Sequence, residues 1–145
     1  MVAGQMIDMA PGGAPEDSDA LITITRMNRL KTGALIGFAV EAGSLLGAAS
    51  DEARHALARY AHDVGMAFQM VDDLLDLEAT EEELGKASGK DAAAGKVNFV
   101  TLLGAEGARA RVQMLADQAK AHLALFGPRG SVLSALVDYI VDRRR

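Results

Sequence analysis

The chain of 145 residues contains no cysteine, only three prolines and few aromatic residues, which make up 4% of the sequence. Without cysteine, disulfide bonds and thiolate metal sites are excluded, and a reducing compartment such as the cytoplasm is the natural setting. Scarce prolines and aromatic residues, beside many alanines, leucines and methionines, favour helices over sheet. Apolar residues make up 50% of the chain, so we expect one folded domain with a sizeable core.

The chain also lacks an excess of positive charge and a long unbroken apolar run. Its net charge is −5 and no basic stripe with interleaved aromatic residues is present, so a general nucleic-acid binder is not expected. Glu41 and several glycines break the longest apolar stretch, residues 32–49, and the first residues show no signal-peptide pattern. We therefore predict a soluble cytoplasmic protein without stable membrane insertion.

The order of apolar and polar residues predicts an all-α chain, without a strand pattern or an internal repeat. A short apolar helical piece at 1–10 precedes a loop at 11–19, whose proline, glycine and aspartate residues are typical of turns. The other predicted elements are helices at about 20–49, 51–77, 99–125 and 131–143, a Lys/Gly-rich loop at 85–98 and a turn at 127–130. The apolar positions of the 20–49 helix wrap widely around it, as in a buried bundle helix.

Three aspartates lie close together within the apolar run FQMVDDLLDLE, residues 68–78. On a helix Asp72 and Asp76 stack one turn apart, with Asp73 beside them and Gln69 a turn earlier. Carboxylates on one face at ~5–6 Å repel each other unless a cation compensates them, and hard oxygen ligands select Mg²⁺, Mn²⁺ or Ca²⁺. The alternative is a solvated acidic edge, because acidic pairs on exposed helices are common.

Lysines flanked by glycines follow the aspartates in the segment LGKASGKDAAAGK. The ammonium groups of Lys86, Lys90 and Lys96 suit phosphate oxygens, because each is a compact charge on a mobile stem. Upstream, Lys31 and Thr32 interrupt an apolar helix, although Lys31 alone has the simpler reading of a side chain that reaches the surface. Together these groups predict a clamp for a diphosphate and a divalent cation, with apolar helices forming a pocket for a hydrophobic tail.

Four ordered segments of the chain resemble the trans-isoprenyl diphosphate synthases, and within that family they are most similar to bacterial farnesyl diphosphate synthases (geranyltranstransferases). The segments are GQMIDM (4–9), KTGALIGFAVEAGSLLG (31–47), GMAFQMVDDLLDLE (65–78) and LGKASGKDAAAGKVNFVTLLG (84–104). The resemblance implies an all-helical bundle around a central cavity, a homodimer, and Mg²⁺-dependent condensation of an allylic diphosphate with isopentenyl diphosphate. Mn²⁺ is an alternative cation.

The resemblance also implies roles for individual residues. It assigns Asp72 and Asp73 to metal-binding positions of the family's second aspartate-rich motif, which Asp76 completes. The positions near the allylic diphosphate are matched by Lys31, Thr32, Gln69 and Lys86, with Lys31 and Lys86 contacting its oxygens.

Other residues match the family less directly. Gln5 lies in a motif that lines the cavity, and Asp8 is a further candidate there. Phe99 stands where many relatives have tyrosine, which puts a hydroxyl-dependent role in doubt. The basic tail at 143–145 resembles a segment that can close over the site, although a solvated helix end explains it equally well. The histidines are interpreted as surface or packing residues: His55, His62 and His122.

The family's first aspartate-rich motif and the Gly-Lys-Arg segment that binds isopentenyl diphosphate are not found in this chain. Residues 1–145 are therefore expected to form about the C-terminal half of a prenyl diphosphate synthase domain, and to be inactive alone. The alternatives are a partner or regulatory subunit that completes a site with another chain, and a non-catalytic helical dimerisation module. Helices intended for a closed bundle would leave apolar surface exposed, so self-association is expected.

Overall fold

The structure is a computed structural model, and it describes residues 2, 6, 17–82 and 97–143. Within these residues every regular element is a helix and none is a strand, which confirms the all-α prediction. Residues 11–16 of the predicted N-terminal loop and residues 85–96 of the Lys/Gly-rich loop lie outside the described part of the chain.

Where the sequence predicts one helix at 20–49, the structure has three consecutive segments. Helix α2 (Asp17–Asn28) leads into a π-helical segment, η1 (Arg29–Gly33), which continues as α3 (Ala34–Leu46). The amides of Gly47 and Ala49 then donate to carbonyl groups in the last turns of α3, each at 2.9 Å, and Ala48 between them has a φ of 48°. A left-handed residue at this position closes a helix, so α3 ends earlier than the apolar pattern indicates.

The longest element is α4 (Asp51–Glu82), which extends past the predicted end near Leu77. It is followed by α6 (Phe99–His122), by a 3₁₀ segment, η2 (Ala124–Gly130), and by α7 (Ser131–Val141). The predicted turn at 127–130 falls within η2, where Gly127 has a φ of 52°. The glycine permits this conformation, so the chain reverses direction between α6 and α7.

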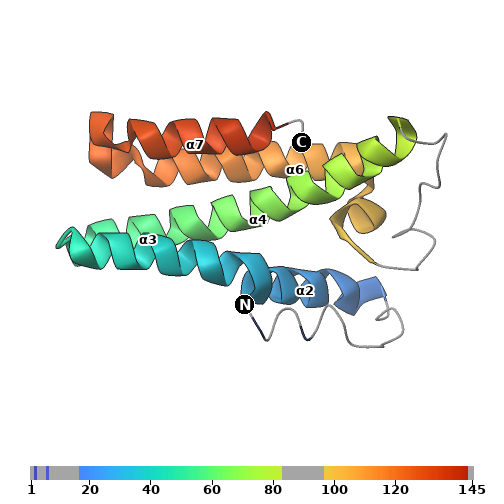
Figure 1. The fold of residues 1–145 in the computed structure, drawn as a ribbon, viewed down its shortest axis with the longest axis horizontal. Coiled ribbons are helices and arrows are strands. Elements are labelled where there is room, and N and C mark those ends of the chain that lie inside the picture. The colour runs from blue at the N-terminus through green and yellow to red at the C-terminus, as the bar shows by residue number, and fades with distance from the viewer. Residues whose placement is uncertain (1, 3–5, 7–16, 83–96, 144–145) are drawn as a thin grey trace.

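Helix α4 lies between two layers, with α2 and α3 on one side and α6 and α7 on the other (Figure 1). One core cluster joins α4 to α6 through Met70, Leu74 and the fully buried Phe99. A second cluster joins the N-terminal half of α4 to α6 and α7, where the Tyr60 hydroxyl donates to the Leu133 carbonyl at 2.9 Å. These contacts hold α4 firmly against the α6–α7 layer.

The first turn of α6 is set at an angle to the rest of that helix (Figure 1). Asn98 and Thr101 form a capping box: the Asn98 side chain accepts from the Thr101 amide at 2.8 Å, and the Thr101 hydroxyl accepts from the Asn98 amide at 2.9 Å. Gly104, with φ 71° and ψ 162°, breaks the helix after this turn. The bend directs the capped turn toward the C-terminal half of α4.

One stretch of the described chain, Ala124–Val141, is long and apolar enough by composition to cross a membrane, with a mean hydropathy of 1.2. It is not one straight helix, because Gly127 interrupts it and α7 itself has 11 residues. Eleven residues of α-helix extend about 17 Å, whereas a bilayer core is about 30 Å thick. The geometry therefore does not favour a spanning helix here.

Candidate functional site

One face of α4 carries small and polar side chains in a repeating pattern. Steps of alternately four and three residues place side chains in a single row along a helix. The row is Asp51, His55, Ala58, His62, Gly65, Gln69, Asp72 and Asp76. The predicted aspartates therefore occupy the C-terminal end of a face that continues unbroken to the start of α4.

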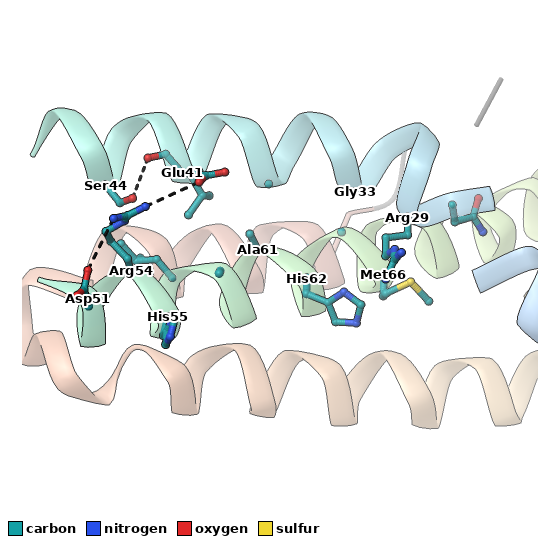
Figure 2. Close-up of a pocket in the computed structure, with 16 residues that line it drawn as sticks. Arg29, Gly33, Glu41, Ser44, Asp51, Arg54, His55, Ala61, His62 and Met66 are labelled. Carbon is teal, nitrogen blue, oxygen red and sulfur yellow. Dashed lines mark hydrogen bonds and ion pairs between the residues drawn. The ribbon is translucent and has the colours of Figure 1, made fainter. Parts of the chain in front are cut away.

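A cavity of about 440 Å³ lies between α3 and the N-terminal half of this face. Glycine and alanine residues line it together with His55 and His62, and η1 approaches α4 closely where Gly33 meets Gly65. Figure 2 shows Gly33, Arg29 and Met66 toward one end and Glu41, Ser44 and Arg54 at the other. Gly65 lies beside Gly33, and Gln69 and the aspartates follow Gly65 along α4. The end of the cavity near Gly33 is therefore the end nearest to the aspartates.

A chain of hydrogen bonds connects η1, α4 and α6. The Thr32 hydroxyl donates to the Gln69 side-chain oxygen at 3.2 Å, and the Gln69 side chain in turn donates to Asp73. The Phe99 amide, at the start of α6, donates to Asp73 Oδ2 at 3.1 Å. The structure thus brings together three residues that the sequence singled out, Thr32, Gln69 and Asp73, and shows what positions them.

The Asp73 carboxyl has a pKa raised from 3.8 to about 6, chiefly because burial removes water from its charged form. The hydrogen bonds from Phe99 and Gln69 act in the opposite direction, and the negative charges of Asp76 and Asp72 raise the pKa further. The repulsion expected between the three aspartates is therefore present. A cation at this end of α4 would relieve it.

Asp72 is paired with a basic residue from the far end of the chain. Arg143, just after α7, donates a hydrogen bond to Asp72 Oδ1, and its guanidinium carbon lies 4.3 Å from the centre of the Phe68 ring. Only 15% of the Arg143 side chain is exposed. Arg143, the first residue of the predicted basic tail, therefore reaches Asp72 and is not part of a solvated helix end.

The residues present fit a magnesium ion held together with a phosphate. No three His, Cys, Asp or Glu side chains within the described residues converge to make a complete protein cage. Mg²⁺ does not need one, because it is commonly held by one or two carboxylates, with waters and substrate phosphates as its other ligands. Asp72 and Asp76, one turn apart on the same face, can provide such carboxylates if Asp72 uses the oxygen that Arg143 does not bind. Asp73 already accepts from protein donors on α4 and α6.

Lys31 and Thr32 both lie in η1. Single π-helical turns occur frequently at functional sites, and this one carries the Lys-Thr pair at the end of the cavity nearest Gln69. Five further residues singled out from the sequence lie outside the described part of the chain: Gln5, Asp8, Lys86, Lys90 and Lys96.

Sequence reasoning predicted an apolar pocket but did not place it between α3 and α4, and it missed the charged residues at its far end, Glu41, Asp51 and Arg54. Two signals were available: the four-three spacing along α4, and the run of glycine and alanine at facing positions of α3 and α4. The three histidines lie in different environments. His55 and His62 line the cavity, whereas His122 Nε2 lies 3.2 Å from Asp63 Oδ2 and connects α6 to α4.

The profile of the polyprenyl synthetase family matches residues 1–124, most of the chain. The chain belongs to the polyprenyl synthetase family. It is 45% identical over 123 residues to a dimethylallyltranstransferase from Fischerella ambigua, and 40% identical over 151 residues to the farnesyl diphosphate synthase of Escherichia coli. Its fold is similar to that of an FPP/GFPP synthase from Zymomonas mobilis, with a TM-score of 0.78 at 41% identity over 97% of the chain.

The chain spans half or less of the length of these relatives. It covers 36% of the Fischerella protein, 49% of the Escherichia coli enzyme and 45% of the Zymomonas mobilis structure. A geranylgeranyl pyrophosphate synthetase from Geoglobus acetivorans, with a TM-score of 0.76 at 26% identity, is covered to 53%. The relatives thus contain a further portion that this chain does not match.

Proposed function

We propose that this chain supplies the second aspartate-rich half of a prenyltransferase site, which condenses an allylic diphosphate with isopentenyl diphosphate in a complete polyprenyl synthetase domain. The observation that carries the proposal is the single face of α4, on which a carboxylate cluster and a small-residue cavity adjoin each other. A site for a charged head group beside a cavity that is partly lined by small apolar residues matches the chemistry of a prenyl diphosphate. The relatives named above support the same reaction class.

The head group would lie at the C-terminal end of α4. Asp72 and Asp76 would hold Mg²⁺, which supplies positive charge where the diphosphate leaves. Lys31, from η1, would bind phosphate oxygens from the α3 side of the groove. The Thr32–Gln69 hydrogen bond fixes the side chains between the lysine and the carboxylates, so that the leaving group meets a preorganised surface.

The prenyl chain would lie along the cavity between α3 and α4. The apolar part of its lining, which includes Val40, Leu57 and Met66, would shield the allylic carbons from water, so that the carbocation formed on ionisation would be protected from hydrolysis. The double bond of isopentenyl diphosphate attacks this carbon, a new carbon–carbon bond forms, and a proton is then lost to a base such as the released diphosphate. The described side chains need provide no nucleophile for these steps.

We further propose a farnesyl-length product, a homodimer of complete domains and a cytoplasmic location. The similarity to farnesyl diphosphate synthases supports the product, and the absence of cysteine suits a reducing compartment. The chain alone is proposed to be inactive, because the relatives contain a further portion that would provide the opposing metal ligands. Labelled isopentenyl diphosphate incubated with the purified chain and an allylic diphosphate should remain unincorporated.

The test uses a complete domain, made by joining this chain to the portion of the Zymomonas mobilis FPP/GFPP synthase that it does not cover. Calorimetry measures the uptake of an unreactive allylic diphosphate analogue with Mg²⁺ present. Asp72→Asn should weaken Mg²⁺-assisted binding by more than about tenfold, whereas Asp117→Asn, an exposed change on α6, should leave it intact. Equal affinity for both variants would remove the basis of the proposal.

A second candidate, a non-catalytic helical partner, is favoured by one observation. The outer face of α3 exposes large apolar side chains: Leu35, Phe38, Leu45 and Leu46. Such a stripe on a helix that is apolar all round is typical of an element that packs on both sides. A complete domain that assembles but takes up neither Mg²⁺ nor the diphosphate analogue would favour this candidate.

A further inference from the structure

Two glycines meet where η1 crosses α4. A Cβ atom added to Gly65 would lie 3.2 Å from the Gly33 Cα and 3.9 Å from the Gly33 nitrogen. Carbon atoms in contact normally stay about 3.5–4.0 Å apart, so the backbone of η1 occupies the space that a side chain at position 65 would need. Figure 2 shows Gly33 opposite the stretch of α4 between His62 and Met66, in which Gly65 lies. The absence of a side chain at Gly65 is therefore what allows this approach.

The residue before Gly33 makes a second contact with α4. The Thr32 hydroxyl donates to the Gln69 side-chain oxygen at 3.2 Å, and this bond is partly buried. Gln69 follows Gly65 by four residues, which is about one helical turn. Two consecutive residues of η1 thus touch α4 one turn apart, by a backbone contact and by a hydrogen bond. Together the two contacts fix how far η1 lies from α4 and how it is turned toward it.

The hydrogen bond between η1 and α4 tolerates little movement. Bonds donated by a hydroxyl are typically about 2.7–2.8 Å long, and a separation of about 3.6 Å is no longer a hydrogen bond. A methyl group at Gly65 would have to move Gly33 away by roughly 0.4 Å to reach a normal contact. A shift of the same size along the bond would lengthen the Thr32–Gln69 separation from 3.2 Å to about 3.6 Å, and so break it.

The proposed diphosphate site depends on the same spacing. Lys31, which would bind phosphate oxygens, lies next to Thr32 in η1. On α4, the Gln69 side chain donates to Asp73, beside the proposed magnesium ligand Asp72. The distance between η1 and α4 therefore sets the distance between the lysine and the carboxylates.

We propose that Gly65 is a positioning residue for the diphosphate site: it lets η1 approach α4 closely enough for Thr32 to bond to Gln69. The inference rests on the proposed prenyltransferase function and adds to it a residue that acts through the placement of Thr32 and Lys31. Negative charge grows on the diphosphate as it leaves, and donors placed in advance stabilise that charge most in the transition state. A displaced η1 should therefore slow the reaction more than it weakens substrate binding.

The first test uses this chain without substrate or metal and measures its unfolding equilibrium in urea by circular dichroism. Thr32→Val removes the hydroxyl and should raise the unfolding equilibrium constant about fivefold, as expected for one hydrogen bond. In a Gly65→Ala background, where the bond is already broken, the same change should raise it by less than about twofold. Gly33→Ala is the matched control background, because a Cβ atom there would meet no atom of α4 within 4 Å, so the fivefold effect should remain.

The second test uses the complete domain described above, and it carries the same comparison where the shorter chain is too unstable to measure. Gly65→Ala should lower kcat for condensation by about tenfold and change KM for the allylic diphosphate by less than about twofold. Thr32→Val should lower kcat by about tenfold alone, but by less than about twofold when it is added to Gly65→Ala. Gly43→Ala is the control, because this glycine of α3 has open space beside it and does not line the cavity, and kcat should be unchanged.

The outcomes separate this inference from the function on which it rests. An effect of Thr32→Val that is equally large with and without Gly65→Ala would overturn the positioning role and leave the prenyltransferase intact. A raised KM with an unchanged kcat in Gly65→Ala would overturn it too, because the methyl group would then only obstruct the prenyl chain. No product from the unsubstituted domain, together with no uptake of the diphosphate analogue, would overturn the proposed function itself, whereas the unfolding comparison would still report on Gly65.

Discussion

On the side of α4 that meets α6 and α7, the interface is made by side chains such as Phe99 and Val137, which are essentially inaccessible to solvent. On the side that meets η1 and α3, Gly33 and Gly65 lie close together, and a cavity of about 440 Å³ lies next to them. Both interfaces belong to one long helix. The first fills its volume with side chains, whereas the second leaves volume empty.

The difference separates the residues that hold the fold together from those available for a ligand. Close packing maximises dispersion contacts and the burial of apolar surface, so a filled interface serves stability. An interface of glycines brings two helices close without filling the space beside them, so it leaves a cavity that a ligand can occupy. Helix α4 thus presents a structural face and a site face, and substitutions on the two faces should have different consequences.

The largest expected effect comes from emptying the packed face. Phe99→Ala removes a fully buried ring between α4 and α6, and should lower the free energy of unfolding by about 3–5 kcal/mol. Phe38→Ala is the matched change on the outer face of α3, where the side chain is 69% exposed, and should change it by no more than about 0.5 kcal/mol. Urea unfolding followed by circular dichroism measures both, and similar losses would contradict the division between the faces.

A smaller effect is expected where the glycine interface is filled. A Cβ atom at Gly65 would lie 3.2 Å from the Gly33 Cα, so Gly65→Val must push α3 away from α4, at about 1–3 kcal/mol. Gly37→Ala meets open space instead, and should stabilise the helix by up to about 1 kcal/mol because alanine loses less backbone entropy. If Gly65→Val were as stable as the unsubstituted chain in the same urea titration, the close helix crossing would not be a constraint.

The comparison of the two faces also explains how far the sequence alone could reach. Helices follow from local apolar spacing, so the all-α class and the positions of α4, α6 and α7 were accessible. The conformation at η1 was not, because nothing in the five residues Arg29–Gly33 distinguishes a π-helical turn from an α-helical one. Its presence depends on the packing of the whole α2–α3 path against α4.

The site shows the same division between local and long-range information. The shared face of Gln69, Asp72 and Asp76 follows from helical periodicity, and the resemblance to prenyl synthases suggested their chemistry. The Phe99 amide on Asp73, and Arg143 on Asp72, join residues 26 and 71 positions apart in the chain. Contacts of that separation depend on the bend at Gly104 and on the return of α7, which periodicity does not reveal.

The smallest expected effect concerns the partly buried carboxylate of Asp73, which lies where the two faces of α4 meet. In metal-free buffer the raised pKa of Asp73 means that the folded chain binds this proton more tightly than the unfolded chain does. The stabilising contribution of protonation is therefore complete below about pH 4, and is lost as the pH rises through about 6. For a fully buried group the difference between 3.8 and about 6 corresponds to ~3 kcal/mol, and partial solvent access at Asp73 reduces it to about 1–2 kcal/mol.

Asp73→Asn tests this contribution, because asparagine can still accept a hydrogen bond from the Phe99 amide but carries no charge. The free energy of unfolding of the variant should lose the decline between pH 4 and pH 6 that the unsubstituted chain shows, and should exceed that of the unsubstituted chain at neutral pH. Asp117→Asn, at the exposed carboxylate that accepts from Gln113 on α6, should retain the decline. A decline that persists unchanged in Asp73→Asn would mean that the carboxylate is well solvated, and that the site face of α4 lacks the electrostatic repulsion from which a cation site was inferred.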